Sequence, residues 1–120
     1  MYLPSTLFTK AYRYAMKHYD HVAILSAKYG LLLPEEVIEP YELTLKTMGE
    51  QKRREWAERV IRQLDEKIGL HKVDRVYFHA GYDYREHLSS LLRSARIQTE
   101  VPLEGLSFGR QLHWYDKHRQ

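Results

Sequence analysis

The spacing of hydrophobic residues alternates between two periods along this chain, and this alternation limits the fold more than any other feature of the sequence. Four segments repeat apolar residues with helical spacing: 7–18, 50–70, 84–95 and 110–118. Three short apolar runs typical of buried strands lie between them: 21–26, 73–78 and 97–101. Strands that alternate with helices are normally joined by right-handed crossovers and run parallel. We therefore predict an α/β fold with a small, mostly parallel sheet of about three strands flanked by helices.

Capping residues support these helix boundaries. Ser5 and Asp83 are the expected N-caps of the first and third helices, and Gly69 lies where the helix over 50–70 should end. The segment 27–48 contains glycine and proline and is long for a connection without regular structure. Such long loops usually serve a function, so this segment is a candidate for binding or catalysis.

The composition is typical of one globular domain, spanning residues 1–120. Hydrophobic residues make up 43% of the chain and charged residues 29%, and the absence of cysteine excludes disulfides and thiolate metal sites. The sequence has no apolar run of about 18 residues and no signal-peptide pattern, so we expect a cytoplasmic protein without a membrane partner. The net charge of +3 favours an anionic partner, although basic and acidic residues are interspersed.

Glycines gather in the three loops that follow the predicted strands. In a parallel sheet these loops share the carboxyl edge, where ligands usually bind. Four of the six glycines lie there: Gly30, Gly81, Gly105 and Gly109. Because glycine lets the backbone approach a ligand closely, the pattern predicts a cleft lined by backbone N–H groups. The alternative is that each glycine only turns a tight corner.

Cations and tyrosines accompany these glycines. The cations suited to holding a phosphate or carboxylate are Lys28, Arg85 and Arg110. The tyrosines suited to stacking on a base are Tyr29, Tyr41, Tyr82 and Tyr84. Together they predict a phosphate-bearing ligand, a nucleic acid or a nucleotide. The alternative explanations are solvated charges and ordinary tyrosine packing.

Two residues near the same edge are candidate acid–base catalysts. Glu39, in the long loop, is a candidate general base, and His79, at the end of the second strand, is a candidate general acid or base. The competing interpretations are a solvated carboxylate and a histidine bonded to the backbone. No two histidines have the i, i+4 spacing of helical zinc ligands, and the GxGxxG, P-loop, GxSxG and HExxH motifs are absent. We therefore expect no metal and no cofactor.

The segment from Ser26 to Leu43 resembles a motif of the YaaA family of peroxide-stress proteins, S-A-x-Y-G-L-L-x-P-x-x-x-I-x-P-Y-x-L. The whole chain is similar to a family of small bacterial, archaeal and phage domains that carry S-A-K-Y-G-L and a later P-L-E-G-L-x-x-G, here Pro102 to Gly109. The positions that carry over from the two motifs are Ser26, Lys28, Tyr29, Gly30, Pro40, Tyr41, Gly105 and Gly109. All of them except Pro40 are among the candidate ligand-binding residues.

Both families are more distantly similar to uracil-DNA glycosylase-like domains, and YaaA-like proteins are linked with DNA binding and protection from oxidative damage. The resemblance therefore implies cleavage or exchange at the N-glycosidic bond of a normal or modified base, or simple binding of a nucleic acid. Three interpretations stay open: an N-glycosidase-like hydrolase, a non-catalytic nucleic-acid-binding module, and a small structural or protein-binding domain.

One difference from the small-domain family concerns the first strand. Members of that family usually begin with another strand and a loop that bears cysteine and lysine, whereas the predicted first helix here follows closely on Met1. The resemblance therefore predicts a sheet that lacks the family's first strand. Because an exposed strand edge favours self-association, a homodimer formed through that edge is a further hypothesis.

Overall fold

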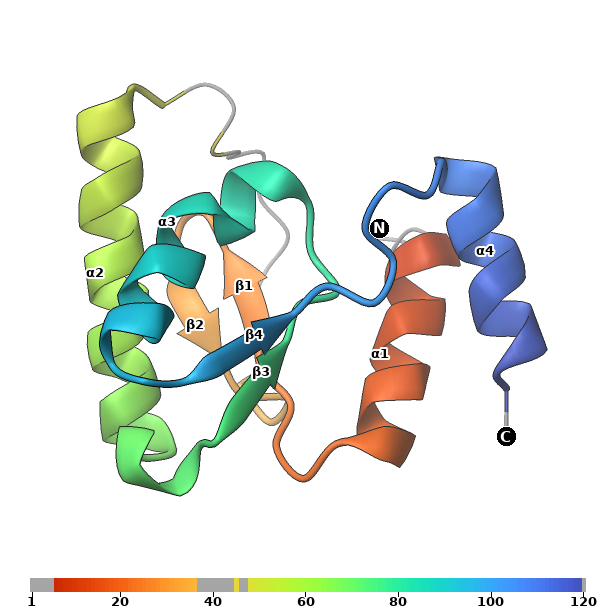
Figure 1. Cartoon of the computed structure of the whole chain (residues 1–120), viewed down its shortest axis with the longest axis horizontal. Coiled ribbons are helices and arrows are strands. Elements are labelled where there is room, and N and C mark those ends of the chain that lie inside the picture. The colour runs from red at the N-terminus through yellow and green to blue at the C-terminus, as the bar shows by residue number, and fades with distance from the viewer. Residues whose placement is uncertain (1–5, 37–44, 46–47, 120) are drawn as a thin grey trace.

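Helices and strands follow one another largely as the hydrophobic spacing predicts. The computed structural model describes residues 6–36, 45 and 48–119. In chain order these residues form α1 (Thr6–His18), β1 (Ile24–Ser26), β2 (Gly30–Leu32), α2 (Glu50–Lys67), the 3-10 helix η2 (Leu70–Lys72), β3 (Arg75–Tyr77), α3 (Tyr82–Ser94), β4 (Gln98–Glu100) and α4 (Phe108–Lys117). Figure 1 shows the strands between α2 and α3 on one side and α1 and α4 on the other.

The described strands form two separate two-stranded sheets, which corrects the prediction of one mostly parallel sheet of about three strands. β1 and β2 pair antiparallel with Leu25 opposite Leu31, whereas β3 and β4 pair parallel with Val76 opposite Thr99. The α/β class is confirmed, and α3 connects the two parallel strands. β2 was not predicted, because it lies in the segment that we expected to lack regular structure.

A short turn, and not a crossover helix, connects β1 to β2. The Tyr29 N–H donates a hydrogen bond to the Ser26 hydroxyl oxygen at 2.9 Å, which closes the turn. On the outer side of β2, the Leu31 N–H donates to Gln63 Oε1 of α2 at 2.8 Å, and the Leu31 carbonyl accepts from Lys67 Nζ at 2.8 Å. Helix α2 therefore bonds the backbone edge that a further strand would otherwise occupy.

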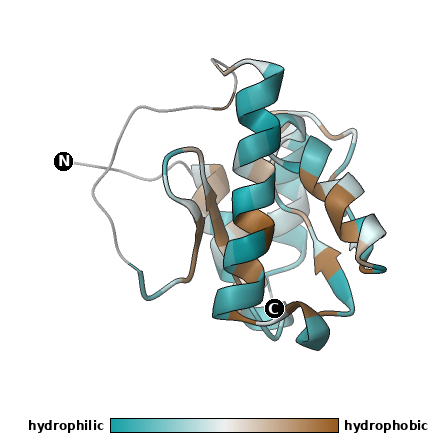
Figure 2. Ribbon diagram, turned by 90° about the vertical axis from the view of Figure 1, so that its left-hand side faces the viewer, coloured by the Kyte–Doolittle hydropathy of each residue, from teal (hydrophilic) through white to brown (hydrophobic). Residues whose placement is uncertain are grey.

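Helix α2 supplies much of the hydrophobic core, as its apolar stripe predicts. Its buried residues are Trp56, Ala57, Val60 and Leu64. They pack in one cluster with Leu88 and Leu92 of α3 and with Phe78 and Ile97 beside the parallel strands. Figure 2 shows hydrophilic residues along much of the outer side of α2 and hydrophobic strands behind it. The apolar face of α2 that the sequence predicts is therefore the face that is buried.

Helices α1 and α4 form a second helical pair (Figure 1). Lys10 and Asp116 form an ion pair between them. The rings of Tyr14 and Trp114 meet edge to face, with 5.0 Å between their centroids. The first and last described helices therefore lie side by side. No helix in the described part of the chain is long and apolar enough to cross a bilayer.

Two helix boundaries differ in detail from their predictions. Gly81, and not Asp83, is the N-cap of α3, and Asp83 instead lies in the first turn, where it pairs with Arg53 of α2 at 3.3 Å. Gly69 follows the end of α2 with a φ of 103°, as its predicted role at the helix end requires. Ser5 lies outside the described residues.

Gly30 is the position at which a side chain would be most disruptive. Its φ is 83°, and an added Cβ would lie 2.1 Å from Gln63 Oε1, the atom that accepts the Leu31 N–H. We expect Gly30→Ala to lower the free energy of unfolding by about 2–3 kcal/mol. Gly105→Ala is the matched control, because its φ is 84° with open space around the added Cβ, and it should cost only about 1 kcal/mol. Urea denaturation measures both losses of stability. Equal losses would show that the contact with Gln63 does not add to the cost of a side chain at position 30.

Candidate functional site

Side-chain contacts link the turns that follow β1, β3 and β4 into one border of the molecule. Trp56 of α2 joins the first two: its Nε1–H donates to the Ser26 carbonyl at 2.8 Å, and its ring meets Tyr84 of α3 edge to face at 5.8 Å between centroids. Arg85 joins the second turn to the third, because its Nη1 lies 3.6 Å from Oε2 of Glu104. A continuous series of contacts therefore connects the three loops.

Two exposed tyrosines on this border each have a cation beside the ring. Lys28 Nζ lies 5.2 Å from the ring centroid of Tyr29, and Arg85 Cζ lies 5.4 Å from that of Tyr82. Tyr29 is 36% exposed and Tyr82 is 61% exposed. An exposed ring beside a positive charge is suited to an aromatic ligand that carries phosphate. We call Lys28, Tyr29, Tyr82 and Arg85 the tyrosine–cation border.

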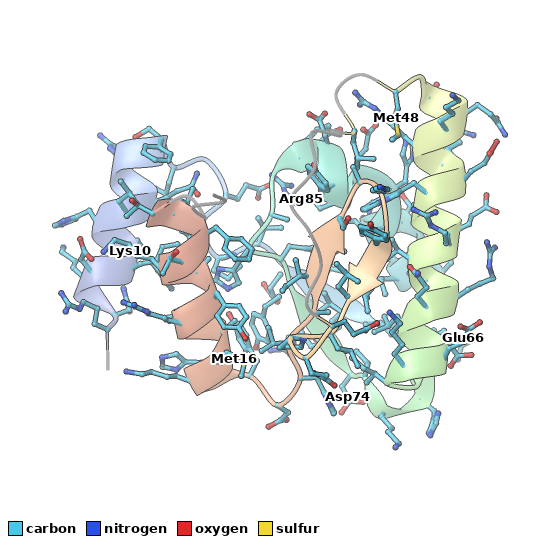
Figure 3. The ribbon with its side chains drawn as sticks, turned by 180° about the vertical axis from the view of Figure 1, so that it is seen from behind. Lys10, Met16, Met48, Glu66, Asp74 and Arg85 are labelled. Atoms are coloured by element: carbon cyan, nitrogen blue, oxygen red, sulfur yellow. The ribbon has the colours of Figure 1, made fainter. Side chains whose placement is uncertain are left out.

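Arg85, labelled in Figure 3, is partly buried, whereas Lys28, the other cation of this border, is exposed. Its side chain is only 16% exposed, whereas that of its partner Glu104 is 68% exposed. Arg85 Nε is buried and has no hydrogen-bond partner among the described residues. A phosphate that displaced Glu104 would accept two parallel hydrogen bonds from the guanidinium. The ion pair therefore positions Arg85 without using all of its donors.

His79 follows β3 and lies within a cluster of aromatic rings. Its Nε2 is 2.7 Å from the Tyr19 hydroxyl, and its Nδ1 is 2.6 Å from the Tyr115 hydroxyl. A neutral imidazole has one donor and one acceptor nitrogen, so one hydroxyl donates to the ring and the other accepts from it. Burial lowers the pKa of His79 to about 4 and raises the pKa of Tyr115 to about 12. Burial also raises the pKa of Tyr19, so the three groups are neutral at ordinary pH.

The two hydrogen bonds of His79 affect its candidacy as a general acid or base. Both nitrogens of His79 are engaged by side-chain hydroxyls, and not by the backbone as the competing interpretation held. In this arrangement neither nitrogen is free to take a proton from water, so a general acid–base role for His79 stays a prediction. Glu39 and Tyr41 lie outside the described residues.

The motif residues of the first turn have structural roles in the hairpin. Ser26 is 4% exposed, and its hydroxyl and carbonyl oxygens accept hydrogen bonds from Tyr29 and Trp56. Gly30 faces Gln63 of α2. Lys28 and Tyr29 are the two residues of this motif that reach the surface.

The remaining glycines and Arg110 divide between two places. Gly81 caps α3 at the border, and Gly105 follows Glu104 in the third turn. Gly109 and Arg110 are exposed in the first turn of α4, where the Ser107 hydroxyl accepts a hydrogen bond from the Arg110 N–H at 3.4 Å. Because α4 packs chiefly against α1, the structure places Arg110 on the second helical pair and not beside the hairpin.

Three residues that shape the site were not singled out for it from the sequence. Trp56 was predicted only as a core residue, although the N–H of a buried tryptophan usually requires an acceptor, which was an available signal. Tyr19 and Tyr115 lie 60 and 36 positions from His79 along the chain, so no local spacing indicated them. Among the described residues, no group of three or more His, Asp or Glu side chains is placed to hold a metal ion.

Comparison with known proteins gives a family and two distant relatives. The family of unknown function DUF6884 matches residues 1–117. A UPF0246 protein of Paracidovorax citrulli (strain AAC00-1) is 30% identical over 83 residues, which are 65% of this chain and 32% of the relative. A UPF0246 protein of Burkholderia multivorans (strain ATCC 17616 / 249) is 31% identical over 89 residues, 68% of this chain and 34% of the relative. The chain thus spans about a third of these curated relatives, which belong to the YaaA family. No solved structure matches it significantly.

Proposed function

Because this chain belongs to DUF6884, a family of unknown function, we propose its function from the site itself. The tyrosine–cation border binds a nucleotide, or a nucleic acid whose bases are unpaired or flipped out. The observation that carries this proposal is the exposed ring of Tyr82 with the guanidinium of Arg85 beside it. Base stacking on an aromatic side chain contributes about 1–3 kcal/mol per base. Arg85 and Lys28 would hold the phosphates on either side of the stacked bases.

Cleavage or exchange at an N-glycosidic bond is the enzymatic form of this proposal. The resemblance of the first motif to the YaaA family, and the more distant one to uracil-DNA glycosylase-like domains, supports it. Such chemistry needs a residue that can activate water or protonate the departing base. Because both nitrogens of His79 are engaged, Glu39 is the better candidate. The described geometry gives more support to binding without catalysis.

Binding is tested with short labelled single-stranded DNA and RNA, titrated by fluorescence anisotropy at several salt concentrations. Tyr82→Ala and Arg85→Ala should each weaken binding by about tenfold, equivalent to roughly 1.4 kcal/mol. Arg85→Ala should also lower the magnitude of the salt slope by about 0.7, the value for one phosphate contact on a single strand. The proposal fails if neither ligand binds at low salt.

The matched control is Arg93→Ala, which removes the same charge from the exposed last turn of the same helix. It should leave affinity nearly unchanged, and an equal loss in Arg93→Ala and Arg85→Ala would show that only net charge matters.

Release of free base from normal and modified strands, with Glu39→Gln as comparison, tests the enzymatic form. Self-association through a strand edge stays a prediction, which sedimentation velocity tests.

A further inference from the structure

A cavity of about 600 Å³ lies between α1 and the two sheets. One wall is formed by residues 22–25, which lead into β1, and another by residues 72–80, which contain β3. β1 and β3 belong to different sheets and are not hydrogen-bonded to each other. The cavity is therefore bounded by two strands from separate sheets.

The hydrogen bonds of the two sheets show which backbone groups face this gap. The Phe78 N–H donates to the Glu100 carbonyl of β4 at 2.8 Å. Because successive residues of a strand direct their N–H groups to opposite sides, the Tyr77 N–H points away from β4. In the hairpin, both backbone groups of Leu31 point toward α2, so those of Leu25, opposite it, point away from β2. Neither the Tyr77 nor the Leu25 N–H has a backbone partner among the described residues.

Polar residues line part of the gap, but its strands and covering helices also present apolar side chains to it, several of them only partly buried. Ile24, Leu25 and Val76 line it and are only partly buried. Ala15 of α1 and Leu64 of α2 line it as well. A strand placed here would meet apolar side chains on both of its faces, the environment of a central strand in a sheet covered by helices.

We propose that this gap is a binding site for an extended apolar segment of a partner polypeptide, which pairs with β1 and β3 and joins the two sheets into one. The four lining residues 22–25 span roughly 13 Å at about 3.3 Å per residue, so the segment has about four or five residues. A second copy of this chain is a poor occupant, because each of its described strands is already paired in its own sheet. A small apolar molecule would fill the space but leave the Tyr77 and Leu25 N–H groups without partners.

The proposal is tested by amide hydrogen exchange on the isotope-labelled 120-residue chain. The probes are a panel of capped hexapeptides built from valine, isoleucine, leucine and threonine with a lysine at each end. A bound strand should slow exchange of the Tyr77 and Leu25 N–H groups at least tenfold. The Phe78 N–H, which already donates to Glu100, is the internal control and should change much less.

The same peptides with N-methylated central residues keep their apolar side chains but lose backbone donors, so they should bind at least tenfold more weakly. Equal binding of the N-methylated peptides would overturn the proposal in favour of a pocket for small apolar molecules. Failure of every peptide in the panel to protect Tyr77 would also overturn it. Protection of Tyr77 that grows with protein concentration in the absence of peptide would identify a second copy as the occupant instead.

Discussion

Trp56→Ala is expected to lower the free energy of unfolding by about 3–5 kcal/mol, the range for removing a large aromatic side chain from a core. Trp56 is 6% exposed, and it connects the hairpin to α3 through the Ser26 carbonyl and the Tyr84 ring. The substitution therefore leaves a cavity and removes one hydrogen-bond donor to the Ser26 carbonyl. Urea denaturation at neutral pH, followed by far-ultraviolet circular dichroism, measures the loss.

Trp56→Phe separates these two contributions. Phenylalanine keeps an aromatic ring in the core but has no N–H for Ser26, so the expected loss is about 1–3 kcal/mol. The same variant should loosen the first turn, which exchange of the Tyr29 N–H would report. If Trp56→Phe is as stable as the parent protein, the hydrogen bond to Ser26 contributes nothing and the connection is packing alone.

Lowering the pH from 6.5 to 4 is expected to destabilise the protein through His79. Burial lowers the pKa of this imidazole from 6.5 to about 4 in the folded chain, so between these values the unfolded chain binds a proton that the folded chain does not. The contribution is complete above pH 6.5, falls as the pH falls toward 4, and is constant below that. The full shift corresponds to about 3 kcal/mol, and partial exposure of the ring to solvent reduces it to roughly 1–2 kcal/mol.

The control for this pH dependence is His79→Phe, which keeps an aromatic ring but cannot titrate. It should be less stable at neutral pH, because the Tyr19 and Tyr115 hydroxyls lose their partner, and its stability should fall less between pH 6.5 and 4. His113→Phe, at an exposed position of α4, should retain the slope of the parent. Parallel stability curves for the parent and His79→Phe would contradict the assignment.

Helices were predictable because their packing leaves a local signature. The spacing of Trp56, Val60 and Leu64 specifies one buried face of α2, and that face is the buried one. β2 left no comparable signature, because a strand of three residues after a turn of three resembles any apolar stretch of a loop. The backbone groups of Leu31 that face away from β1 are bonded by Gln63 and Lys67, which α2 supplies from more than thirty positions away.

The apolar run before Ser26 led to a prediction of a strand covered on both faces. Ile24 and Leu25 do form β1, but they are only partly buried, because the cavity adjoins them. An apolar run of this kind indicates that the surroundings of a strand are apolar. It does not indicate whether a neighbouring strand is present, because that depends on pairing between distant parts of a chain.

The sequence was sufficient to predict which residue types lie at the candidate site, but not which side chains contact one another across its loops. The sequence placed Lys28 and Tyr29 in one strand-end loop and Tyr82 and Arg85 in another, and the structure shows each cation beside a tyrosine ring. The contact of Arg85 with Glu104 arises only when the third turn packs against α3. Side-chain contacts of this kind have no spacing rule in the sequence.

The pairing of α1 with α4 has a consequence for how the chain acquires its structure. Lys10 and Asp116 are 106 positions apart, so the inner side of α1 finds its partner only after nearly all of the intervening residues have been synthesised. Until α4 leaves the ribosomal tunnel, α1 exposes apolar surface, and during that interval the nascent polypeptide is most open to aggregation and chaperone capture.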